Sequence, residues 1–78
     1  MQPKVEYIRL FGMSIQEIIK ARRADLHISQ QQLAEMAEVS VATVKDIERG
    51  TANPSLHTLQ QIGVVVGMEV TMKLRQTI

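Results

Sequence analysis

Residues 28–50 read ISQQQLAEMAEVSVATVKDIERG, and this stretch decides the fold. Ser29 begins a capping box, because its oxygen can accept the backbone N–H of Gln32 while the Gln32 side chain reaches back to the serine N–H. Ser40 is a second helix cap, and only residues 38–40 separate the two helices that these serines define. So short a link forces a sharp bend between the helices, which is the geometry of a helix-turn-helix.

Two more serine caps lie on either side of this stretch. Ser14 and Glu17 form another capping box, and Ser55 follows a proline that cannot continue the preceding helix. Apolar residues recur at helical spacing after each cap, so we expect helices over residues 14–25, 30–37, 41–49 and 56–66. Gly50 is placed to end the third helix in a left-handed conformation. The sequence therefore predicts a mostly α, four-helix domain over residues 14–67.

After Gly67 the hydrophobic period changes from helical to alternating. Apolar and polar residues alternate over residues 68–75, which predicts a β-strand within 68–78 whose apolar face holds Met68, Val70, Met72 and Leu74. One strand cannot satisfy its own backbone groups, so it needs a partner. The partner is either the N-terminal stretch 4–10 or the same strand of a second copy, and we favour the second copy, which makes 68–78 a dimerisation strand in an intersubunit sheet. Residues 1–13 are ambiguous and are assigned as an N-terminal arm. Met13 is itself a plausible start residue, so residues 1–12 are an arm, an extra strand or an addition that is not part of the natural chain.

Composition bounds the function classes. A chain of 78 residues and 8.8 kDa forms one domain, and the absence of cysteine excludes disulfides, a thiolate nucleophile and a cysteine-based zinc site. Two histidines are too few for a metal site, and Ser40 is explained by capping rather than by nucleophilic catalysis with His57. We therefore expect no enzyme, no catalytic residue, no metal and no cofactor. We also expect no membrane contact and a cytoplasmic location, nucleoid-associated when the protein binds DNA.

From Ile19 to Gly67 the chain resembles the Xre/Cro/lambda-repressor type of helix-turn-helix domain. The resemblance rests on ARR at 21–23, ISQQQLA at 28–34, VSVATV at 39–44, IERG at 47–50 and NPSLHTL at 53–59. The ending GMEVTMKL at 67–74 is similar, more particularly, to that of HipB-type antitoxins. That resemblance implies a homodimer, joined by its C-terminal strands, that represses its own operon and binds a HipA-type kinase toxin.

The resemblance also implies which residues touch double-stranded DNA. The third helix enters the major groove with its amino end first, which makes the candidate base contacts Ser40, Val41, Ala42, Thr43, Lys45 and Asp46. The candidate phosphate contacts are Gln30, Arg49 and Asn53. Arg23 and Glu48 match the family's partly buried ion pair between the first and third helices.

Three positions depart from the family pattern. His27 and Glu38 stand where the family favours glycine, so each must adopt a left-handed conformation at a cost, or the turn geometry must differ. Arg22 falls within the apolar stripe of the first helix, where its stem can lie along the core while its head finds a phosphate or an acid.

Two functions from different classes remain. The first is a homodimeric, sequence-specific repressor that binds a palindromic operator, in the context of an autoregulating HipB-like antitoxin. The alternative is a protein-interaction module that neutralises a partner protein with little or no DNA binding. The formal net charge of +1 favours the alternative, since DNA-binding domains are usually strongly basic.

Overall fold

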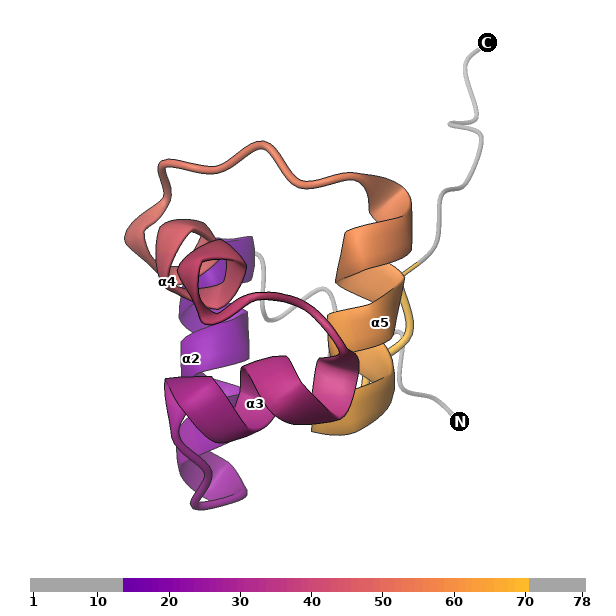
Figure 1. The fold of residues 1–78 in the computed structure, drawn as a ribbon. Coiled ribbons are helices and arrows are strands. Elements are labelled where there is room, and N and C mark those ends of the chain that lie inside the picture. Colours follow the sequence, from indigo (N-terminus) through magenta and orange to yellow (C-terminus); the bar gives the residue numbers. More distant parts are fainter. Residues whose placement is uncertain (1–13, 71–78) are drawn as a thin grey trace, which may run out of the picture.

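The computed structural model describes residues 14–70, which form four helices around one apolar centre (Figure 1). The helices are α2 (Ile15–Asp25), α3 (Gln30–Ala37), α4 (Val41–Arg49) and α5 (Leu56–Val66). These bounds agree with the helices predicted from the sequence, apart from Ser14, which is the cap of α2 rather than its first residue. The predicted mostly α, four-helix architecture is therefore confirmed.

Each helix begins at a serine whose hydroxyl accepts a backbone N–H from the first turn. Ser29 Oγ accepts from the Gln32 amide at 3.0 Å, and the Gln32 side chain accepts from the Ser29 amide at 2.8 Å. Ser14 and Glu17 make the same reciprocal pair at 3.4 and 3.0 Å. Ser40 and Ser55 make single caps to the amides of residues 43 and 58. Since each cap satisfies a donor that has no partner within the helix, the four helix starts are fixed locally.

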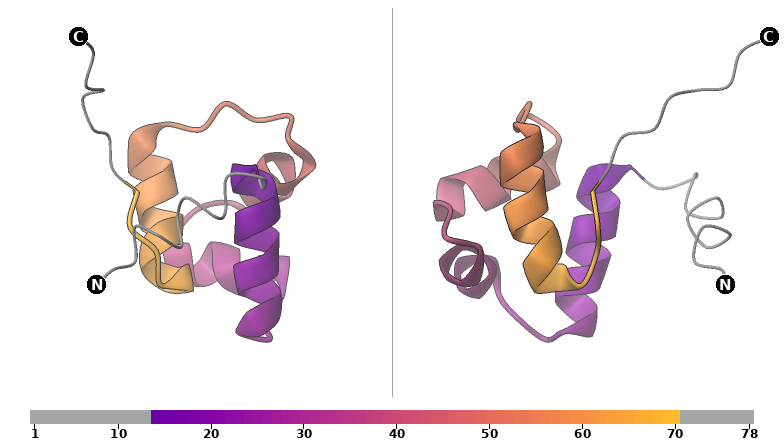
Figure 2. Two further views of the ribbon diagram at one scale, coloured as in Figure 1. Left: turned by 180° about the vertical axis from the view of Figure 1, so that it is seen from behind. Right: turned by 90° about the vertical axis from the view of Figure 1, so that its right-hand side faces the viewer.

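Within residues 14–70 the core is entirely aliphatic and draws on all four helices. Its buried members are Ile19, Leu33, Ala34, Ala37, Val44, Ile47, Ile62 and Val66. In Figure 1, α3 runs across the molecule from α2 to α5, and α4 lies above the α2 end of α3. Seen from behind, α2 and α5 are nearest the viewer and the α3–α4 pair lies farther away (Figure 2, left). The helix-turn-helix thus occupies one face of the domain, and α2 and α5 form the opposite face.

The chain leaves α5 through a turn that requires glycine at two positions. Gly67 has φ 76°, in the left-handed region, and the Met68 amide donates to the Gly63 carbonyl at 2.8 Å. A Cβ on Gly63 would lie 2.6 Å from the Met68 carbonyl oxygen, so only glycine fits within this turn of the helix. Residues 68–70 then run back beside α5 (Figure 2, right).

The predicted dimerisation strand is only partly within the described residues. Met68 and Val70 are described and belong to no strand, whereas Met72 and Leu74 lie outside the described residues. Among residues 14–70 no helix is both long and apolar enough to cross a membrane.

In each of the turns before α3 and α4, one residue has a left-handed backbone conformation although it is not glycine. His27 has φ 57° and Glu38 has φ 60°. Glu38 is the C-cap of α3, and the Val39 amide that follows it donates to the Ala34 carbonyl at 3.0 Å. This bond requires the left-handed turn, so the glycine-type geometry is retained with strain, which costs roughly 1–2 kcal/mol for an L-residue with a side chain.

We expect Glu38→Gly to raise the free energy of unfolding by about 1 kcal/mol, because glycine adopts the left-handed conformation without strain. Glu35→Gly is the matched control in the exposed interior of α3, where glycine should lower stability by about 1 kcal/mol. Urea denaturation of both variants and the parent measures the difference. A loss of stability in Glu38→Gly would show that this turn is not strained.

Candidate nucleic-acid interface

The cap and first turn of α4 present two exposed residues, and Val41 and Thr43 beside them are half-buried. Ser40 and Ala42 are exposed, whereas Val41 is half-buried and packs against the core. The family resemblance makes Val41 a candidate base contact. In the structure part of that side chain serves the core instead, because the sharp turn after α3 directs it inward. Ala42 is therefore the small apolar residue of this turn that a groove can reach without loss of packing.

The hydroxyls of Ser40 and Thr43 interact with each other at 2.8 Å, in addition to the cap from Ser40 Oγ to the Thr43 amide. Both groups therefore have a partner within the first turn of α4. A hydroxyl can donate once and accept twice, so each retains spare capacity for a base edge or a phosphate. Capping is the role that the contacts show for Ser40.

Charged side chains of α4 follow the first turn. Asp46 and Arg49 form an ion pair with an Oδ1–Nη1 distance of 3.4 Å, and Arg49 remains exposed over 62% of its side chain. Lys45 is exposed, and no ion pair of the described part of the chain involves it. An exposed i,i+3 pair contributes little stability, so the Arg49 guanidinium can exchange Asp46 for a phosphate at small cost.

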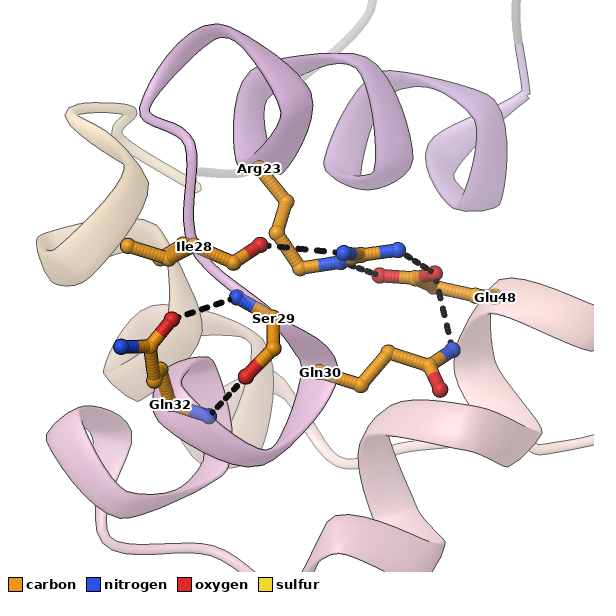
Figure 3. A network of polar contacts seen from close by, with 6 residues as sticks. All are labelled: Arg23, Ile28, Ser29, Gln30, Gln32 and Glu48. Carbon is orange, nitrogen blue, oxygen red and sulfur yellow. Dashed lines mark hydrogen bonds and ion pairs between the residues drawn. The ribbon is translucent and has the colours of Figure 1, made fainter.

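Arg23 and Glu48 form a two-pronged ion pair that joins α2 to α4 (Figure 3). Arg23 Nε and Nη2 each donate to one carboxylate oxygen at 2.9 Å, and Nη1 donates to the Ile28 carbonyl at 3.0 Å. The Glu48 side chain is only 3% exposed. The structure thus brings together the two residues that the family resemblance paired, and it adds the loop before α3 as a third attachment point.

Gln30 joins this network from the first residue of α3. Its amide nitrogen donates to Glu48 Oε1 at 3.1 Å (Figure 3). An amide nitrogen carries two hydrogens, so one remains for a phosphate while the other holds Glu48. The first backbone N–H groups of α3 lack partners within the helix and point the same way as the helix dipole. The ion pair therefore holds the Gln30 side chain beside the amino terminus of α3, where the free N–H groups and the helix dipole favour anions.

The buried network shifts the ionisation of its acid. Burial acts to raise the pKa of Glu48, but hydrogen bonds from Arg23 and Gln30 and the charges of Arg23 and Lys20 outweigh it. The pKa of Glu48 is consequently held below its ordinary value of 4.5. The carboxylate is charged at neutral pH, as its function as acceptor for three donors requires.

Two further residues complete the comparison with the sequence. Asn53 is exposed in the loop between α4 and α5, as a phosphate contact must be. Arg22, expected to reach a phosphate or an acid, donates from Nε to the Val66 carbonyl at 3.0 Å and lies 3.5 Å from Asp25. Arg22 therefore satisfies a carbonyl at the C-terminal end of α5. The only sign of this contact in the sequence was the position of Arg22 within an apolar stripe. The described residues contain no cluster of metal-binding side chains.

Comparison with known proteins agrees with this geometry. A family model described as helix-turn-helix matches residues 19–70, which include all four helices from the middle of α2 onward. The chain belongs to the helix-turn-helix family.

Three similar proteins contain a region that matches this helix-turn-helix domain. The chain is 41% identical to an immunity repressor protein of Bacillus phage phi105, over 76% of this chain and 41% of the relative. It is 34% identical to the HTH-type transcriptional regulator DdrOP3 of Deinococcus deserti, over 74% of this chain and 45% of the relative. It is 33% identical to the control protein C.BamHI of Bacillus amyloliquefaciens, over 77% and 70%. The chain spans less than half the length of the first two relatives.

We expect the free energy of unfolding to fall as the pH drops below about 4.5. Because the pKa of Glu48 is lower in the folded state, the unfolded state binds more protons in this range, so stability rises with pH and is lost on acidification. Glu48→Gln removes this titration and should flatten the pH dependence while lowering stability at neutral pH.

Glu35→Gln is the control for that measurement, since Glu35 is exposed and should leave the slope unchanged. Urea denaturation of the three proteins between about pH 3 and pH 7 measures the slope for each. Equal slopes in the parent and Glu48→Gln would mean that Glu48 does not contribute to acid sensitivity.

Proposed function

We propose that this chain is a sequence-specific DNA-binding repressor of transcription that inserts α4 into the major groove. The single observation that carries the proposal is the helix-turn-helix face, on which a tightly capped α4 presents exposed Ala42 and Lys45 beside the oriented amide of Gln30. An α-helix fits the major groove of B-DNA, and its amino-terminal residues reach the base edges. The names of the relatives, which include an immunity repressor and a transcriptional regulator, support the same class.

The exposure of these side chains and their contacts support the following division of roles. Ala42, with the exposed part of Val41, offers apolar contact to thymine methyl groups, and Lys45 can donate to guanine or to phosphate. Gln30, Arg49 and Asn53 contact the backbone and set the register. Ser40, Thr43 and Asp46 complete the proposed base-contacting set, with Asp46 acting through its pairing to Arg49 because its own charge repels phosphate.

We propose that the repressor acts as a homodimer on a palindromic operator. One α4 offers few long polar side chains, so a single subunit has modest affinity, and two subunits can bind half-sites about 34 Å apart in successive major grooves. The proposed dimer contact is segment 68–74, in which apolar and polar residues alternate, paired with the same segment of the second subunit in an intersubunit sheet. The support for this contact is the sequence pattern and the turn at Gly63 and Gly67 that leads the chain into it.

An autoregulating antitoxin with a HipA-type kinase toxin as partner is the narrower form of the proposal. Its support is the resemblance of residues 67–74 to HipB-type antitoxins. Repression of its own promoter by occupancy needs no catalytic step and no cofactor. The competing class, a protein-interaction module, gains support from the near-neutral net charge.

We expect Ala42→Asp to lower operator affinity at least about tenfold, because it places a negative charge beside the phosphates at the amino end of α4. An aspartate near a helix start is favourable to the helix itself, so the fold should persist. Operator fragments are first selected from the host's genomic DNA with the purified protein at about 0.15 M salt. The affinity of each variant for a selected fragment is then measured by titration monitored by fluorescence anisotropy. Affinity should fall by about 0.9 log unit per log unit of salt for each phosphate neutralised.

Ala21→Asp is the matched control, since Ala21 is exposed in the middle of α2 on the side away from buried Ile19. It adds the same charge and should change affinity little. Equal affinities in the two variants would exclude α4 as the reading helix. A selection that enriches no fragment over bulk DNA would favour the interaction-module function instead.

The homodimer is tested by its proposed strand. Met72→Lys combined with Leu74→Lys should abolish self-association, because charge replaces the apolar face at both positions, whereas Thr71→Lys on the other face should leave it intact. Sedimentation equilibrium over a range of concentrations distinguishes monomer from dimer. A dimer that survives the double substitution would place the interface elsewhere.

A further inference from the structure

Side chains of α2, α5 and the returning residues 68–70 line an apolar hollow. These elements lie on the face opposite the helix-turn-helix (Figure 2). The volume of the hollow is about 150 Å³. Aliphatic side chains form most of its lining, among them Ile15, Ile18, Ile19, Leu59, Ile62 and Val70. Ile15 is 42% exposed although it lies in the helix face that packs against the rest of the domain. An exposed apolar hollow in so small a domain indicates a missing apolar occupant.

The size of the hollow indicates what kind of group fills it. An apolar cavity of about 150 Å³ is large enough to bind benzene, so this one accepts a single aromatic ring. The core of the described residues contains no aromatic side chain. The chain has only two aromatic residues, Tyr7 and Phe11, and both precede α2.

The start of α2 lies next to this hollow, because Ile15, Ile18 and Ile19 line it. The Ser14 capping box fixes the backbone where it enters the helix, with φ −76° and ψ 166° at the cap. In a hydrophobic staple the residue before the cap packs on the fourth residue of the helix, which here pairs Met13 with Ile18. Ile18 lines the hollow. Phe11 is three residues before Ser14, a span of at most about 11 Å, so its ring can reach the same place.

We propose that the chain's own residues 5–13 fold back over the groove between α2 and α5, with the Phe11 ring in the hollow and Met13 on Ile18. Val5, Ile8 and Leu10 supply further apolar contacts along the groove. The segment completes a core that residues 14–70 leave open at Ile15. The groove between α2 and α5 lies on the face away from α4, so a segment that covers it leaves room for a DNA duplex.

A cysteine pair tests this proposal in the full chain, which has no cysteine of its own. Phe11→Cys combined with Leu59→Cys should form a disulfide within one chain under mild oxidation, because Leu59 lines the hollow. The control pairs Phe11→Cys with Val64→Cys, which is 81% exposed on α5 and does not line the hollow. Non-reducing electrophoresis and intact mass report the products.

A cross-link within the chain for residue 59 and not for residue 64 supports the proposal. A covalent dimer through residue 59 would overturn it by assigning the hollow to a second copy. Equal cross-linking of both pairs, or none, would also overturn it.

Stability gives an independent measurement. Phe11→Ala should lower the equilibrium constant for folding at least about tenfold, because it removes the ring from an apolar site. Arg9→Ala, in the same segment, should leave it nearly unchanged. Equal stabilities of the Phe11→Ala variant and the parent would show that the ring is not buried.

Discussion

The ion pair between Arg23 and Glu48 is the interaction on which the rest of the domain depends. It joins α2 to α4, and through the Ile28 carbonyl and the Gln30 amide it also attaches the start of α3. A buried carboxylate is tolerated only when its oxygens are satisfied, and removal of one partner from such a pair costs about 3–5 kcal/mol. The orientation of α4 relative to α2 and to the start of α3 is therefore set by hydrogen bonds as well as by aliphatic packing.

The same network links stability to the proposed contacts with DNA. Gln30 is held by Glu48 with one hydrogen of its amide, so its orientation does not have to be acquired when a phosphate arrives. At the other end of α3, the strained residue Glu38 keeps the sharp turn that places Ala42 and Lys45 outward. The turn is retained because the aliphatic core on both sides of it overrides the local preference of a glutamate.

The domain has two faces with separate tasks. α3 and α4 form the face proposed for DNA, and α2 with α5 forms a face whose apolar hollow the N-terminal segment is proposed to cover. Residues 68–70, the first part of the segment proposed for dimerisation, run along this second face, and Met68 and Val70 line the hollow. The cover and DNA contact can thus be present together because they use opposite faces, whereas the cover and the dimer contact meet at Met68 and Val70.

The sequence by itself determined the four helices, nearly to the residue. Serine caps, a glycine C-cap and apolar spacing act within a few residues of the chain, so they are legible before the fold is known. The pairing of Arg23 with Glu48 was also accessible, through the family resemblance rather than through any local rule. The alternating residues 68–75 still predict a strand, since most of that segment lies outside the described residues.

Only the tertiary structure decided how these elements use their side chains. Val41 turns partly into the core, Arg22 closes α5 at the Val66 carbonyl, and Gly63 is required because the Met68 carbonyl approaches its Cα. The physical reason is common to all three. Each depends on the approach of backbone from another turn or helix, at a distance that the final packing sets and that no local pattern records.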